Sequence, residues 1–194
     1  MSFKFIEVEK DGFFLELERV LGFVSTEFAQ YHIDSDVSLK EYDFHDRKKY
    51  REFFKQFAES ENEAWKLKTT LEWDFSIFPY RESTDFLKGI FHILRTGGAY
   101  GEDDGAPYQE TEALEIVSKY DTEFKRDSED YYIFDTIIED VRGMDMSGGF
   151  GIPDETLELK SISQWFYLTA WDDLIFVLNL HTNTLYVMAY TDSD

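Results

Sequence analysis

Two neighbouring apolar runs decide the fold: Leu174-Ile175-Phe176-Val177-Leu178-Asn179-Leu180 and Thr184-Leu185-Tyr186-Val187-Met188-Ala189. Each run has the length of a buried strand and is bounded by turn residues. Only His181, Thr182 and Asn183 separate the two runs, and so short a connection makes them antiparallel neighbours. We therefore predict that the C-terminal part of the chain completes an antiparallel sheet.

Two further apolar runs, Leu157–Ile162 and Trp165–Ala170, come just before this pair and end at the turn residues 171–173. Together the four runs predict a β-meander, with packed aromatic side chains that include Trp165, Tyr167, Phe176 and Tyr186. Alternation also predicts an edge strand at Lys4–Glu9 and one or two strands within 64–78. Residues 131–141 fit helical spacing, but their β-branched and aromatic content also fits a strand.

Helical spacing of apolar residues dominates the rest of the first two-thirds of the chain. It predicts helices over residues 13–21, ending at Gly22, and over residues 44–60. A third helix begins at a Ser83 or Thr84 cap and ends at Gly97–Gly98, and a fourth covers residues 112–120, with Leu114 on its apolar side. A short helix starting at Ser25 or Thr26 is expected to run through residue 33. The prediction is one α+β domain, residues 1–194, with N-terminal and central helices packed on an antiparallel sheet that the C-terminal β-meander completes.

Composition excludes several classes of protein. The 194 residues include 19 Lys and Arg, 41 Asp and Glu, no Cys and 18% aromatic residues, with a formal net charge of −22. An aromatic-rich chain of this length is long enough to bury a sizeable core and is not typical of a disordered acidic chain. Without Cys there is no disulfide scaffold, Cys zinc site or thiol nucleophile. An acidic surface also repels nucleic acid and anionic lipid, so neither is an expected partner.

The N-terminal residues 1–10 alternate charged and apolar side chains, which does not fit a signal peptide. The longest apolar stretch, Leu174–Leu178, is far too short for a transmembrane helix. We therefore expect a cytoplasmic protein.

No motif identifies a reaction. The loop at residues 97–105 is rich in Gly but lacks the Lys of a phosphate-binding loop, and it lacks the ligand spacing of a calcium loop. No two His residues have metal-ligand spacing, and no Gly-x-Ser-x-Gly elbow occurs. The basic stretch at residues 47–55 is interpreted as a solvated helix face, with a small anion-binding patch as the alternative. We expect a non-enzymatic protein without a cofactor or metal.

The negative charge is concentrated in the second half of the chain. Residues 1–96 contain 19 acidic and 14 basic side chains, a net charge of −5, whereas residues 97–194 contain 22 and 5, a net charge of −17. Tyrosines are interleaved with the acidic clusters, and such side chains can anchor a protein contact that charge steers. The segment is either a solvated acidic face or a site for a cationic protein, and for the second case the predicted contact residues are Tyr100, Glu102, Asp103, Asp104, Tyr108, Asp127, Glu129, Asp130, Tyr131, Asp154 and Glu155.

One stretch resembles a known family. Leu17-Glu18, followed by residues 21–31 (Leu-Gly-Phe-Val-Ser-Thr-Glu-Phe-Ala-Gln-Tyr), resembles the N-terminal helix–turn–helix signature of the SUKH superfamily, with Ser25 at its Pro position. The run from Asp173 to Asp192 is similar to the closing strands of that family. The resemblance implies an α+β domain, a role as a bacterial immunity protein that neutralises a toxin, often a nuclease, and no catalytic residues.

Three functional hypotheses follow. The first is an immunity or antitoxin-type protein that binds a basic toxin through the acidic, Tyr-containing segment. The second is a phage-type inhibitor that imitates nucleic acid, which requires regularly spaced carboxylates on one surface. The third is a metal-dependent enzyme that uses carboxylates.

Overall fold

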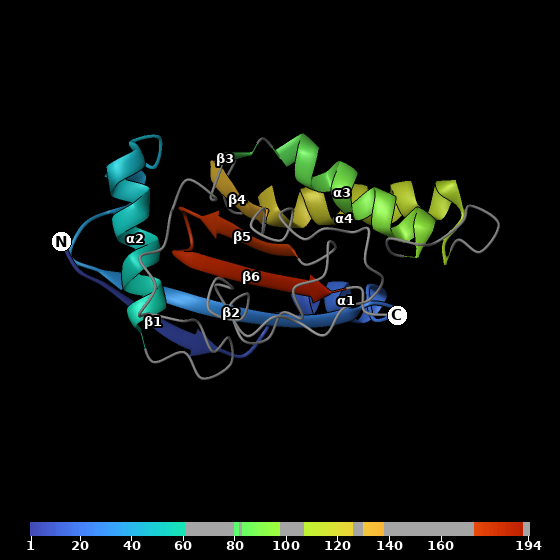
Figure 1. The fold of residues 1–194 in the computed structure, drawn as a ribbon, viewed down its shortest axis with the longest axis horizontal. Helices are drawn as coiled ribbons and strands as arrows, with labels where there is room; N and C mark the ends of the chain where they lie inside the picture. The colour runs from blue at the N-terminus through green and yellow to red at the C-terminus, as the bar shows by residue number, and fades with distance from the viewer. Residues whose placement is uncertain (61–79, 82, 98–106, 126–129, 138–172, 192–194) are drawn as a thin grey trace, which may run out of the picture.

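The structure, a computed structural model, describes residues 1–60, 80–81, 83–97, 107–125, 130–137 and 173–191. Its strands form one six-stranded sheet in the order β1-β2-β6-β5-β4-β3, and every neighbouring pair is antiparallel (Figure 1). The predicted α+β fold is therefore confirmed. The elements are β1 (Phe3–Val8), α1 (Gly12–Val20), β2 (Ser25–Ser35), the 3₁₀ helix η1 (Leu39–Glu41), α2 (Arg47–Glu59), β3 (Tyr80–Arg81), α3 (Ser83–Thr96), α4 (Glu110–Lys125), β4 (Tyr131–Ile137), β5 (Asp173–Asn179) and β6 (Thr184–Thr191).

The predicted C-terminal hairpin forms the centre of the sheet. β5 and β6 pair with Leu178 opposite Leu185. The Oδ1 atom of Asn179 accepts the backbone N–H groups of His181 and Thr182 at 2.9 and 3.1 Å, which stabilises the turn. The other two runs of the predicted meander, with Trp165 and Tyr167, lie outside the described residues, as does the strand pattern within 64–78.

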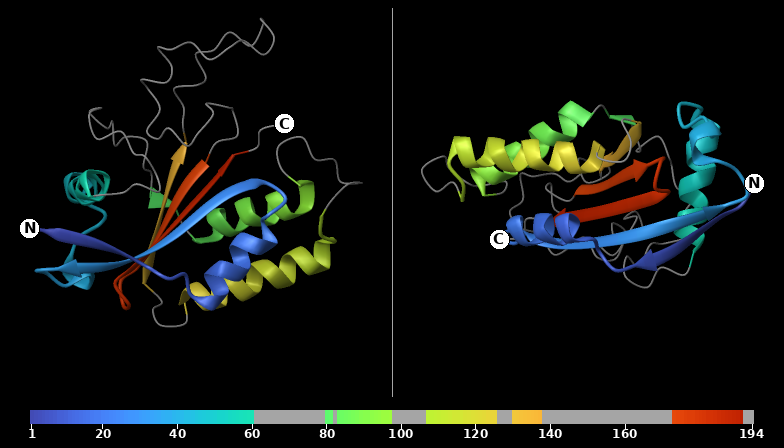
Figure 2. Two further views of the ribbon diagram at one scale, coloured as in Figure 1. Left: turned by 90° about the horizontal axis from the view of Figure 1, so that it is seen from below. Right: turned by 180° about the vertical axis from the view of Figure 1, so that it is seen from behind.

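The central strands are buried on both faces of the sheet. Side chains of successive residues point to opposite faces, so Phe176 of β5 packs toward α2 while its neighbour Val177 packs toward α1, α3 and α4. Figure 2 shows this arrangement in its left view, with α2 on one side of the sheet and the other three helices on the opposite side. Burial on both faces explains why these strands are continuous apolar runs.

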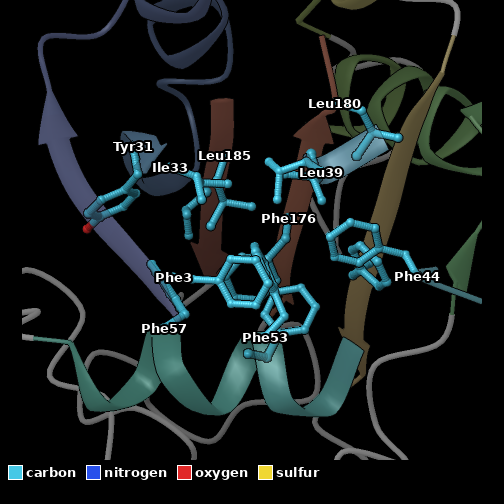
Figure 3. Packing of buried hydrophobic residues seen from close by; sticks show 14 of the residues in the cluster. Phe3, Tyr31, Ile33, Leu39, Phe44, Phe53, Phe57, Phe176, Leu180 and Leu185 are labelled. Carbon is cyan, nitrogen blue, oxygen red and sulfur yellow. The ribbon is translucent and has the colours of Figure 1, made fainter. Parts of the chain in front are cut away.

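Helix α2 covers one face with a stripe of fully buried phenylalanines, as the sequence predicts. Phe53, Phe54 and Phe57 are all 0% exposed. The ring centroid of Phe176 lies 4.8 Å from that of Phe54 and 5.6 Å from that of Phe57. Figure 3 shows Phe53 and Phe57 pointing from the helix toward side chains of the strands. Burial of each such ring stabilises the fold by about 1.5–3 kcal/mol.

Helix α1 is attached to the opposite face by its first residues. Asp11 is the N-cap, and its Oδ1 accepts the N–H of Phe14 at 3.0 Å. The ring centroid of Phe14 lies 4.9 Å from that of Tyr186 on β6. The helix ends at Val20, and Gly22 donates its N–H to the carbonyl of Arg19 at 3.2 Å, so the predicted stop is confirmed.

One predicted helix is wrong. The stretch that begins at Ser25 or Thr26 and runs through residue 33 is strand β2, not a helix. Ala29, Tyr31 and Ile33 face α2, whereas Phe28 faces α1. Because both faces are buried, apolar residues occur at positions that also match helical spacing.

The ambiguous stretch at residues 131–141 is a strand over its described part, β4, so the helical alternative is wrong there. The helix predicted at residues 112–120 is longer and forms α4, from Glu110 to Lys125. The helix predicted to end at Gly97 is α3, and Gly97 has a positive φ of 76° after its last turn.

Candidate functional site

Helix α4 lies between the described members of the predicted contact surface. Tyr108 comes just before the helix, and Asp130 and Tyr131 follow it; Asp130 is exposed. The remaining predicted contact residues lie outside the described residues: Tyr100, Glu102, Asp103, Asp104, Asp127, Glu129, Asp154 and Glu155.

Tyr108 is engaged inside the protein. Its hydroxyl donates to the backbone carbonyl of Val20 at 3.3 Å, and its own carbonyl accepts a hydrogen bond from Arg95 Nη1 at 2.7 Å. The ring lies 6.4 Å from that of Phe23, centroid to centroid. These contacts join the loop before α4 to α1 and α3. Tyr108 therefore has a structural role that the sequence did not indicate.

Tyr131 is also held from within. It is half-buried, and its hydroxyl donates to Asp121 Oδ1 at 3.2 Å. The other oxygen of Asp121 is 2.7 Å from Lys125 Nζ. About 16 Å of helix separate Glu110, beside Tyr108, from Asp121. The structure therefore does not bring the two tyrosines together, and it places them at opposite ends of α4.

The first turn of α4 explains two of its carboxylates. Glu112 Oε2 accepts the backbone N–H of Gln109 at 2.9 Å, which is half of a capping box. Glu110 also lies in the first turn, where the positive end of the helix dipole favours a negative charge. Acidic residues in this part of the sequence thus stabilise a helix end as well as adding to the net charge.

The outward side of α4 has a different character. A shallow depression open to solvent is lined by Leu114, Glu115, Ser118, Lys119, Thr122 and Glu123, which we name the α4 outer face. Leu114 is 49% exposed at one end of it. The carboxylates of Glu110 and Glu115 form no hydrogen bond or ion pair with the described residues.

Lys119 does not leave a free cation on this face. Its Nζ pairs with Glu16 Oε2 on α1, and this hydrogen bond and charge lower the pKa of the Glu16 carboxyl below its usual value. Beneath the helix, burial raises the pKa of the Tyr120 hydroxyl, with Glu16 as a smaller cause. The α4 outer face therefore combines an exposed leucine, small polar side chains and a carboxylate that binds no described cation.

The sequence-based prediction did not include this face, because it placed Leu114 on the apolar side of the helix. In the structure the buried residues are Ala113, Tyr120 and Phe124, and Leu114 lies off that stripe. One stripe of the helix contains Ala113, Ile116, Val117, Tyr120 and Phe124, and Leu114 fits the spacing of that stripe least well. This misfit is the sequence signal that Leu114 is exposed.

Within the described ranges, no group of three or more His, Asp or Glu side chains could hold a metal ion. Nor does any helix in those ranges have both the length and the apolar character needed to cross a bilayer. Comparison with protein-family models, with curated proteins and with solved structures gave no match. Fold and site together describe an α+β protein with an acidic, partly apolar helix face.

Proposed function

We propose that this chain is an immunity or antitoxin-type protein that acts in the cytoplasm by binding a cognate toxin with a basic surface, without catalysis of its own. The distribution of charge is the observation that carries the proposal. Residues 97–194 have a net charge of −17, against −5 for residues 1–96. Excess negative charge attracts a cationic partner and can raise the association rate about 10- to 1,000-fold.

The α4 outer face supports the proposal with a local geometry. Leu114 offers apolar contact area, and Glu115 beside it and Glu110 one turn earlier offer carboxylates to Lys or Arg side chains. Long basic side chains pack their methylene stems on apolar surface while the charged head reaches a carboxylate. A basic protein surface can therefore use both features of this helix at once.

The SUKH resemblance stays a prediction within this proposal. Helix α1 and the Leu21-Gly22 turn agree with the helix and turn that the resemblance requires, whereas β2 replaces the second helix. Charge and the α4 outer face support a basic protein as the partner, whereas the toxin-neutralising role rests on the SUKH resemblance.

Co-purification with the product of the adjacent upstream gene, across a salt series, tests the proposed function. Binding should weaken as salt rises, because salt screens exposed charges. Glu115→Lys should weaken binding, and the matched control Glu41→Lys, which reverses an exposed charge on η1, should not. Binding that ignores salt, or that responds equally to both substitutions, would exclude the acidic helix as the contact.

A further inference from the structure

Strand β1 forms one edge of the sheet that the described strands build. Among the described strands it pairs only with β2. Its residues Ile6 and Val8 are 39% and 37% exposed and lie on the face opposite α2, next to exposed His32 on β2. Figure 1 shows β1 as the outermost strand on the side away from β3. This corner of the sheet thus presents both an open backbone edge and exposed aliphatic side chains.

The pairing of β2 determines which backbone groups of β1 point outward. Ile33 donates its N–H to Asn183, on the β6 side. Because successive residues direct their backbone groups to alternate sides of a strand, His32 points toward β1, where it faces Ile6. Lys4, Ile6 and Val8 therefore bond to β2, and the N–H and C=O groups of Phe3, Phe5 and Glu7 point away from the sheet.

Helix α2 closes part of this edge. Gln56 Oε1 accepts the N–H of Phe3 at 2.8 Å, and Gln56 Nε2 donates to the carbonyl of Met1 at 3.2 Å. Phe5 and Glu7 are left, and no described group bonds to their outward N–H and C=O groups. Two residues with matching geometry on an open edge form a template for another strand.

We propose that the open edge binds β1 of a second copy of this chain, antiparallel, with Ile6 on the twofold axis. In this register Phe5 lies opposite Glu7 of the second copy, and Glu7 lies opposite its Phe5. All the outward groups of these residues are then paired, in four N–H···O=C bonds related by symmetry. An isologous contact of this kind closes at the dimer.

Neighbouring registers fit less well. A register centred on Phe5 requires the N–H of Phe3, which Gln56 already holds. A register centred on Glu7 places two like carboxylates directly opposite each other, which is destabilising in a sheet. In the Ile6 register the two Ile6 side chains instead meet at a close, non-hydrogen-bonded pair, and Val8 lies opposite the methylene stem of Lys4.

The charge of β1 itself does not repel a second copy at this edge. Strand β1 contains one Lys and one Glu, so its own charge is zero, and residues 1–96 have a net charge of only −5. Strand β1 has no excess of carboxylates that could bind a cationic partner segment.

A single cysteine at the predicted axis tests the register, because the chain contains no cysteine. Ile6→Cys should form a disulfide-linked species at twice 23.0 kDa under mild oxidation, since cross-strand pairs of this type lie close enough to be bridged. Leu15→Cys, at an exposed leucine on α1, is the matched control and should cross-link much less. Lys4→Cys and Val8→Cys chains should cross-link to each other when mixed, and less when each is alone.

Sedimentation velocity over a concentration series measures the same contact without cross-linking. The unmodified chain should sediment as a dimer, Ile6→Lys as a monomer, and Leu15→Lys as a dimer, with circular dichroism confirming that each is folded. A monomer at every concentration, or equal cross-linking at residues 6 and 15, overturns the proposal. So does a monomer whose Phe5 and Glu7 amides are protected from hydrogen exchange, because another part of the same chain would then cover the edge.

Discussion

The carboxylate of Asp11 joins the start of α1 to the centre of the sheet. Its Oδ1 accepts the N–H of Phe14 at 3.0 Å, and its Oδ2 accepts the hydroxyl of Tyr186 at 3.1 Å. Its own backbone N–H donates to Gln30 Oε1 at 2.8 Å. Tyr186 and Gln30 are only 6% and 8% exposed. We predict that Asp11→Ala is strongly destabilising, because it removes an N-cap and the hydrogen bond from the buried Tyr186 hydroxyl to a carboxylate.

The magnitude follows from these two contacts. Loss of an N-cap costs about 1 kcal/mol, and loss of a hydrogen bond from a buried hydroxyl to a carboxylate costs about 1–3 kcal/mol. Asp11→Ala should therefore lower the free energy of unfolding by about 2–4 kcal/mol. In a chain of this size each kcal/mol lowers the melting temperature by about 2–4 °C, so a loss near 3 kcal/mol corresponds to about 6–12 °C.

Urea unfolding of three variants and one double variant separates the contacts. Asp11→Asn keeps a side-chain cap and a polar partner for Tyr186, so it should cost less than about 1 kcal/mol. Asp11→Ala with Tyr186→Phe should cost less than the sum of the single changes, because each single change removes the same hydrogen bond. If Asp11→Asn costs as much as Asp11→Ala, or if the double variant is simply additive, these two hydrogen bonds do not stabilise the fold as argued.

Three further predictions address other described contacts. Tyr108→Phe should lower the free energy of unfolding by about 0.5–1.5 kcal/mol in urea titration, and it should leave partner affinity unchanged, because the hydroxyl bonds to Val20. Gly97→Ala should cost about 1–2 kcal/mol, since φ is +76° and the added Cβ would lie 3.3 Å from Pro107; no loss would contradict this. Burial, with smaller effects of Glu52 and Asp46, raises the pKa of Tyr42 from 10.0 to about 12. A raised pKa stabilises the fold fully below pH 10 and loses that effect as pH rises through 12, so Tyr42→Phe should flatten the decline of stability between those values.

The sequence predicted the elements with one buried face well. Helix α2 has a single stripe of aromatic residues, an N-cap at Asp46 and a polar opposite side. The spacing of its apolar residues therefore fits a helix and no other element. The β5–β6 hairpin was predictable for a different reason, because only three residues connect two apolar runs. In both cases a local constraint determines the structure, and distant parts of the chain need not be known.

Elements buried on both faces could not be predicted in the same way. β2 and β4 each pack residues against α2 and against the helices on the opposite side. Their apolar residues therefore lose the period of two, and chance spacings such as Tyr131 with Phe134 match a helix. The deciding information is the presence of a helix on each side of the sheet, which is a property of the assembled fold.

Prediction from sequence has the same limit at the candidate site. Sequence spacing placed Tyr108 and Tyr131 on an acidic surface, but it could not show that Val20 and Asp121 bind their hydroxyls. Leu114 was expected to be buried, and it is exposed because five other side chains of α4 already fill the interface. Net charge identified the acidic half of the sequence. The contacts of individual side chains determine which of its residues remain available to a partner.

The described sheet edges differ in how completely they are protected. β2 extends past the end of β1, and there Glu18 Oε1 on α1 accepts the N–H of Phe28 at 3.3 Å. Lys10 in turn pairs with Glu18. Gln56 protects the edge of β1 at Phe3 in a similar way. Side chains thus bond to the backbone groups on either side of Phe5 and Glu7, but no described group bonds to the outward backbone of these two residues. This open length is the length that a reciprocal β1 pair requires. Natural proteins usually protect open edges, so this gap favours a strand from a second copy as its occupant.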